Sequence, residues 1–179
     1  MENNFYLNNL SDDIKYILVS FLITLAIGIT TGMLYLYYTT NANTLGVIEH
    51  YKGSTNLSYE GDLDDFLDKP PKTKKYLHDM LETTHTHVIA FSVISILIGL
   101  IFYFNSIIKG KLKLFLIIEP FISTIITFSS LWIMRYFNDS FVYLTIASAI
   151  LLYPCWYIMI FISIYELCFK KEIDKNKNF

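Results

Sequence analysis

Four long apolar stretches dominate the pattern of hydrophobic and polar positions along this chain. They cover residues 14–38, 85–105, 114–137 and 141–169. A helix of about 20 apolar residues crosses the ~30 Å hydrocarbon layer of a bilayer, and each stretch is at least that long. The pattern therefore predicts an all-α fold, in which residues 1–179 form one integral membrane domain built as a four-transmembrane-helix bundle.

The polar segment between the first two stretches, residues 39–84, is predicted to be an exterior loop. Within it, residues 58–69 are typical of a short acidic helix, which the two following prolines end. From Lys72 the helical pattern continues without a break into the second apolar stretch. We therefore expect one helix from Lys72 to Asn105, which starts outside the membrane and then crosses it.

The lysines predict the orientation of the bundle. Lys15, the three lysines between the second and third stretches and the four tail lysines fall on one side of the membrane if both termini are cytoplasmic. The loop of residues 39–84 then lies on the exterior side. The first stretch is too long for the core of a signal peptide, so we expect it to be an uncleaved anchor.

Composition narrows the classes of function. The chain is 54% hydrophobic and has a formal net charge of −2, with no cluster of Lys or Arg that is typical of a nucleic-acid surface. Cys155 and Cys168 lie thirteen residues apart in one predicted helix, which is too far for a disulfide. No phosphate-binding glycine loop and no Ser-His-Asp set can be assembled. The lipid bilayer is the partner that this composition predicts.

Three of the four histidines gather where the loop meets the second stretch. They are His78, His85 and His87, and the fourth, His50, lies earlier in the loop. Neutral imidazole binds haem iron and transition metals, and a helix bundle is a usual scaffold for b-type haem. His85 and His87 diverge by roughly 200° on a regular helix, so both cannot bind one iron. A further ligand such as His50 is required.

The two faces of the second stretch differ in character. His85 leads a face of small residues, with Ser92, Ser95 and Gly99, and we expect this face to meet the bundle and leave room for a flat ring. His50, His85 and His87 are therefore the candidate haem ligands. The alternative is that these histidines are interfacial residues that hydrogen-bond water and loop carbonyls.

A second candidate site is a metal centre on the same helix. His78, Glu82 and His85 occupy positions i, i+4 and i+7 and share one face, and His50 can complete a set for zinc or copper. The spacing is not that of the metalloprotease motif HExxH. A solvated helix also carries such residues, and this alternative stays open.

Two charged residues lie near the ends of the third stretch. A carboxylate inside a span is usually functional or paired. Glu119 lies about 8 Å from the cytoplasmic end of the span, by helix rise, and we favour an N-terminal acid with a lysine partner over a proton relay. Arg135, at the other end, can pair with a haem propionate or anchor the helix at the interface, and we favour the anchor.

The segments GVIEHYKG (46–53) and KYLHDMLETTHTH (75–87) resemble a set of small bacterial four-helix inner-membrane proteins. These proteins combine an H-Y-x-G segment outside the membrane with a T-H-x-H opening of the second span. The resemblance implies a place in respiratory-type membranes and haem or metal binding at His50, Thr84, His85 and His87. His78 lies outside that pattern.

Together these features predict a haem- or metal-binding protein of the bacterial inner membrane, an electron-transfer or accessory component of a respiratory-type complex. The alternative is a structural or assembly subunit that carries no cofactor and packs against other subunits of a membrane complex. Gly28 and Gly32 form a GxxxG in the first stretch, which lets helices approach closely, and we expect it to pack within this protein. A small transporter that uses Glu119 ranks lower.

Overall fold

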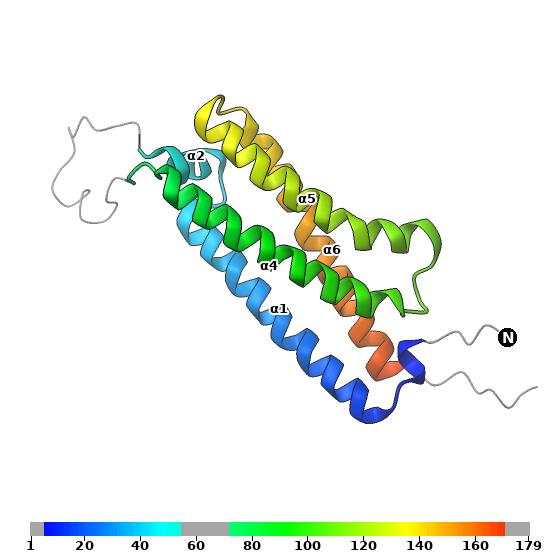
Figure 1. Ribbon diagram of the computed structural model, residues 1–179. Coiled ribbons are helices and arrows are strands. Elements are labelled where there is room, and N and C mark those ends of the chain that lie inside the picture. Colours follow the sequence, from blue (N-terminus) through cyan, green and yellow to red (C-terminus); the bar gives the residue numbers. More distant parts are fainter. Residues whose placement is uncertain (1–5, 55–71, 171–179) are drawn as a thin grey trace, which may run out of the picture.

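The protein is a bundle of long helices, which Figure 1 shows as a computed structural model that describes residues 6–54 and 72–170. In these ranges the helices are η1 (Leu7–Asn9), α1 (Asp12–Thr40), α2 (Thr44–Lys52), α4 (Leu77–Tyr103), α5 (Gly110–Tyr136) and α6 (Phe141–Phe169). Helices α1, α4, α5 and α6 are each long and apolar enough to cross a membrane. The predicted all-α bundle of four transmembrane helices is confirmed.

The observed helices extend beyond most of the predicted spans. Helix α6 begins and ends at the predicted residues, whereas α5 begins at Gly110, four residues before its apolar stretch. Lys111 and Lys113 therefore belong to α5 and not to the preceding loop. The predicted acidic helix of residues 58–69 lies outside the described residues.

The expected helix start at Lys72 is wrong, because residues 72–76 form an extended strap against α2. Ser54 and Lys72 exchange two hydrogen bonds of 3.0 Å, and the Lys75 N–H donates to the Tyr51 carbonyl at 3.1 Å. The backbone N–H and carbonyl groups of Lys72 and the N–H of Lys75 form hydrogen bonds with these distant residues instead of within a helix. Helix α4 starts only after Tyr76, whose N–H donates to the Asp79 carboxylate at 3.0 Å.

Polar contacts inside the apolar bundle join the transmembrane helices. The hydroxyl pairs Thr127–Ser148 and Ser130–Thr145, each at 2.7 Å, connect α5 to α6. The Trp156 indole of α6 donates to Ser95 of α4 at 3.1 Å. In lipid, which offers no hydrogen bonds of its own, such contacts fix the register of neighbouring helices. Helix α1 packs mainly on α2 and α6.

One end of the bundle is closed by the turn between α4 and α5. The Glu166 carboxylate of α6 is fully buried and accepts hydrogen bonds from the Asn105 side chain and from the N–H and hydroxyl of Ser106. Lys113 donates to the Tyr103 carbonyl at 3.0 Å. Both ends of the described chain lie at this end of the bundle (Figure 1). This placement is what an even number of membrane crossings requires.

The opposite end carries α2, a short helix that the sequence analysis did not predict. Asn43 caps it by accepting a hydrogen bond from the Gly46 N–H at 2.6 Å. Gly53 ends it at a φ of +87°, a conformation that favours glycine. An ion pair between Lys52 and Asp139 ties α2 to the turn between α5 and α6. Helix α2 therefore lies across this end of the bundle.

Candidate functional site

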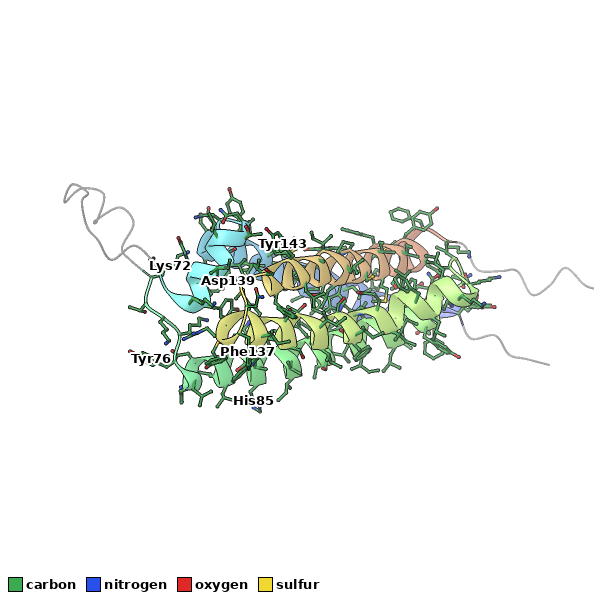
Figure 2. All side chains as sticks on the ribbon, turned by 90° about the horizontal axis from the view of Figure 1, so that it is seen from above. Lys72, Tyr76, His85, Phe137, Asp139 and Tyr143 are labelled. Atoms are coloured by element: carbon green, nitrogen blue, oxygen red, sulfur yellow. The ribbon has the colours of Figure 1, made fainter. Side chains whose placement is uncertain are left out.

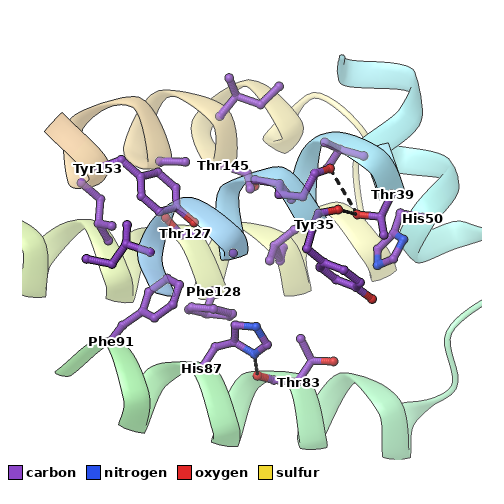
Figure 3. Close-up of a pocket in the computed structure, with 18 of the residues that line it drawn as sticks. Tyr35, Thr39, His50, Thr83, His87, Phe91, Thr127, Phe128, Thr145 and Tyr153 are labelled. Carbon is purple, nitrogen blue, oxygen red and sulfur yellow. Dashed lines mark hydrogen bonds between the residues drawn. The ribbon is translucent and has the colours of Figure 1, made fainter. Parts of the chain in front are cut away.

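A cavity of about 440 Å³ lies between α1, α4, α5 and α6 under α2 (Figure 3). Its floor is formed by buried apolar residues of α5 and α6, namely Phe128, Leu131, Leu152 and Trp156. A volume of this size with apolar walls and a few polar groups is typical of a site for a small molecule or cofactor.

The α1 wall of this cavity includes two glycines among larger side chains. Gly28 and Gly32 both border the cavity, and a Cβ atom at either position would meet no atom within 4 Å. The expectation that this GxxxG packs closely against another helix of the protein is therefore wrong. Helix α1 packs mainly on α2 and α6 instead, and its two glycines border open space in the cavity.

His87 of α4 lines the cavity. Its Nδ1 lies 2.8 Å from the carbonyl oxygen of Thr83 (Figure 3). A carbonyl can only accept, so Nδ1 carries the proton and Nε2 keeps a free lone pair. The rings of Phe91 and Phe128 flank the imidazole, with centroids 5.7 and 5.8 Å away. His87 is thus held in the tautomer that a metal-ligating histidine adopts.

His50 of α2 lines the same cavity from above. Its ring is half-buried and stands edge-on to the Tyr51 ring, with centroids 5.0 Å apart. Burial lowers the pKa of His50 to about 4, and the positive charges of Lys75 and Lys72 act in the same direction. His50 is therefore neutral at physiological pH, which is the form that binds metals.

The structure places His85 away from this cavity. Figure 2 shows the side chain on the outer side of α4, pointing away from the bundle. The buried stripe of α4 runs through Met80, Ser95, Ile98 and Phe102, and His85 lies outside it. The expectation that the face of His85, Ser92, Ser95 and Gly99 meets the bundle is therefore wrong for His85. Ser95, further along the helix, is buried as expected.

The predicted metal set is not brought together. His78 and Glu82 lie on the surface of α4, with side chains 85% and 72% exposed and 4.0 Å between Nδ1 and Oε2. His85 lies on the outer side of the same helix, whereas His50 lines the cavity. Across residues 6–54 and 72–170, no three His, Cys, Asp or Glu side chains form a group that could hold a metal ion.

Glu119 is buried inside α5, away from the cavity lining. Because α5 begins at Gly110, Glu119 lies in the third turn of the helix, and the expected N-terminal acid with a lysine partner is wrong. Ser123 donates to its Oε1, and its Oε2 has no hydrogen-bond partner among the described residues. Lys113, the nearest lysine in the sequence, donates to backbone carbonyls of the α4–α5 turn.

Arg135, expected to anchor α5 at the interface, is 93% buried. One guanidinium nitrogen, Nη2, donates to the Lys75 carbonyl at 3.0 Å, and the guanidinium carbon lies 5.0 Å from the centre of the Tyr136 ring. Arg135 therefore holds the strap of residues 72–76 against α5. It does not line the cavity.

Sequence reasoning missed Lys75, the charged residue that lines the cavity beside the two histidines. Its Nζ lies 4.8 Å from the centre of the Tyr51 ring. A lysine in a polar loop gives no signal of its own, and its position depends on the pairing of the strap with α2. That pairing involves residues 18 positions apart (Ser54 and Lys72) and 24 apart (Tyr51 and Lys75), and it leaves no local pattern.

A family model described as a transmembrane helical domain matches residues 41–174. The match includes α2, α4, α5 and α6 and leaves out α1. No curated protein and no solved structure matches the chain.

Proposed function

The chain belongs to the Aq_1264_TM family of transmembrane helical domains, and we propose that this multi-pass membrane protein binds b-type haem between His50 and His87. One observation carries the proposal. Two histidines from different elements, α2 and α4, line the same mainly apolar cavity. A haem bound by a histidine of the second span needs a second histidine from the loop. His50 of α2 lines the same cavity as His87.

The protonation states of the two imidazoles support the proposal. His87 donates through Nδ1 to Thr83, which leaves Nε2 free, and His50 is neutral because its pKa is lowered to about 4. Haem iron takes axial ligands from neutral imidazole nitrogens. His50 therefore need not lose a proton before it can bind iron at neutral pH.

The side chains around the cavity suit haem better than a bare metal ion. A zinc or copper ion needs three or four protein ligands, and no such group forms among the described residues. Haem brings four nitrogens of its own and needs only a pair from the protein. Gly28 and Gly32 leave free space along one wall, and aromatic rings form the floor.

We further propose that the protein serves electron transfer in the bacterial inner membrane, as a component or accessory subunit of a respiratory-type complex. A haem held by His50 and His87 would supply one-electron transfer. The residues of this chain would hold the haem and orient the two imidazoles.

The test is an absorption spectrum of the detergent-purified protein, oxidised and then reduced with dithionite. A reduced-minus-oxidised α-band is expected. His50→Ala and His87→Ala should each weaken haem binding by at least about tenfold, which corresponds to roughly 1.4 kcal/mol. His85→Ala is the matched control, since His85 lies two residues from His87 and points away from the cavity (Figure 2).

A featureless spectrum after expression with a haem precursor would exclude the proposal. The same conclusion follows if His85→Ala weakens the band as much as His87→Ala does, because the cavity would then not be the site.

The second candidate is a structural or assembly subunit without a cofactor. The observation that favours it is the exposure of α1, in which only 11% of the most apolar window is buried, against 39% in α6. A helix with so much free surface has room for helices of other subunits. A colourless preparation that retains stoichiometric partner subunits in mild detergent would support this function over haem binding.

A further inference from the structure

The cavity has one charged end. Lys75, in the strap of residues 72–76, lines it beside His50 and Tyr51. At the opposite end the lining consists of apolar and aromatic side chains of α6, such as Leu152 and Trp156, both 1% exposed. A ligand that fills this cavity therefore meets a hydrocarbon-like floor at one end and a cation at the other.

Lys75 carries its charge without an anionic partner in the described part of the chain. No carboxylate there lies within 4.0 Å of its Nζ, which lies 4.8 Å from the centre of the Tyr51 ring. Two other lysines of this end are engaged, and Lys74 is exposed and does not line the cavity. Lys52 pairs with Asp139, and Lys72 donates to the Thr39 carbonyl at 2.7 Å. Lys75 is therefore the lysine that is available to a ligand.

The backbone of Lys75 is fixed from both sides. Its N–H donates to the Tyr51 carbonyl at 3.1 Å, and its carbonyl accepts from the guanidinium of Arg135 at 3.0 Å. Partial burial lowers the pKa of Lys75, and Asp79 opposes this shift. An anion beside the ammonium would offset the free-energy cost of that desolvation. A bound anion would therefore stabilise the charged form of Lys75.

We propose that Lys75 binds a carboxylate at the polar end of the ligand, namely a propionate of the haem that His50 and His87 hold. This inference rests on the proposed function and adds the orientation of the haem, with its propionates toward α2 and its apolar edge toward Trp156. Arg135 is then a positioning residue, which acts through the backbone of Lys75. The phosphate of an anionic lipid has the same charge and is the competing occupant.

The experiment compares haem with its dimethyl ester, in which both carboxylates are neutral. The full-length apoprotein is titrated with each form in a non-ionic detergent and followed by absorption. Wild type is expected to bind haem at least about tenfold more tightly than the ester, since a charge-assisted hydrogen bond is about twice as strong as a neutral one. Lys75→Gln should lower haem affinity to the level of the ester and leave ester affinity unchanged.

Two further variants serve as controls. Lys75→Arg keeps the charge and should keep most of the preference for haem. Lys74→Gln removes the same charge from the neighbouring residue, which is exposed and does not line the cavity, and should leave the preference intact. The comparison of the two ligands on wild type needs no variant, so it remains decisive if Lys75→Gln does not fold.

Each outcome has a distinct meaning. Equal affinity of wild type for both forms would overturn the role of Lys75 while the histidine ligands stand. If neither form binds, the proposed function fails and the inference fails with it. If added phosphatidylglycerol abolishes the tighter binding of haem relative to its dimethyl ester in wild type, Lys75 binds a lipid phosphate and the propionate assignment is wrong.

Discussion

At the scale of single residues, His87 and His50 reach the forms that can bind a metal in different ways. His87 is oriented by a hydrogen bond within its own helix, to the carbonyl of Thr83 four residues earlier. His50 has no such local partner among the described residues. Its neutral form is set by burial and by the lysines of the strap, which come from a different part of the chain. The sequence can suggest the first arrangement but not the second.

The lowered pKa of His50 makes a prediction about stability and pH. Between pH 6.5 and about 4 the unfolded chain binds a proton at His50 that the folded protein does not, so stability falls as the pH falls through this range. The contribution is fully present above pH 6.5. His50→Gln should flatten this part of the profile, measured as the melting temperature in detergent from pH 7.5 to 4.

His85→Gln is the control for this measurement, because His85 is exposed on the outer side of α4. If the profile of His50→Gln matches that of wild type, the neutral state of His50 does not depend on folding, and its role as a prepared ligand loses support.

Residue-level prediction succeeded where helix geometry alone decides the answer. The divergence of His85 and His87 follows from 3.6 residues per turn, and the structure indeed separates them. Which of the two faces the cavity depends on the buried stripe through Met80 and Ser95, and that stripe is set by contacts with α5 and α6. The small residues near Ser95 suggested the wrong side for His85.

At the scale of elements, α2 and the strap after it position His50 and Lys75. Helix α2 has only nine residues and is held by contacts with α1, α5 and α6. Its place depends on Gly46, where a Cβ atom would collide with the carbonyl of Thr40 at the end of α1. The corner between α1 and α2 therefore requires glycine.

Gly46→Ala should displace α2 and destabilise the protein by about 1–3 kcal/mol, the usual cost of overpacking a close contact. Haem binding should weaken as well, because His50 moves with α2. Thermal unfolding and haem titration measure the two effects. For the stability measurement Gly28→Ala is the matched control, since a Cβ there meets nothing within 4 Å.

A Gly46→Ala protein with wild-type stability and haem affinity would contradict the close approach of α2 to Thr40.

At this scale the long helices were predictable and the short elements were not. Some 20 apolar residues are enough to identify a span, so α1, α4, α5 and α6 were found from the sequence. Helix α2 and the strap of residues 72–76 arise from contacts with distant segments, such as the Ser54–Lys72 pair. Propensity favoured a helix from Lys72, and the tertiary contacts overrode it.

At the scale of the whole molecule, the cavity exists because α1 stands apart from α4 and α5. The other three long helices pack on one another, whereas α1 packs mainly on α2 and α6. Its glycines border the open space that this arrangement leaves. The cavity is thus a property of the bundle as a whole and could not be predicted from any one span.

Gly32→Phe should fill the cavity and leave the bundle intact, because the new side chain enters open space. Haem affinity is expected to fall by about tenfold or more, with little change in melting temperature. Thr31→Phe is the control, since it adds the same ring to an exposed neighbour that does not line the cavity.

Unchanged haem affinity in Gly32→Phe would place the haem elsewhere in the protein.

The family match begins at residue 41, just after α1 ends, so one wall of the cavity lies outside the matched residues. The frame of α4, α5 and α6 keeps its internal contacts whatever α1 contributes. A first helix with larger residues at the positions of Gly28 and Gly32 would narrow the cavity without altering that frame. The size of the cavity can in this respect be changed through a single helix, without changes in the three helices that pack on one another.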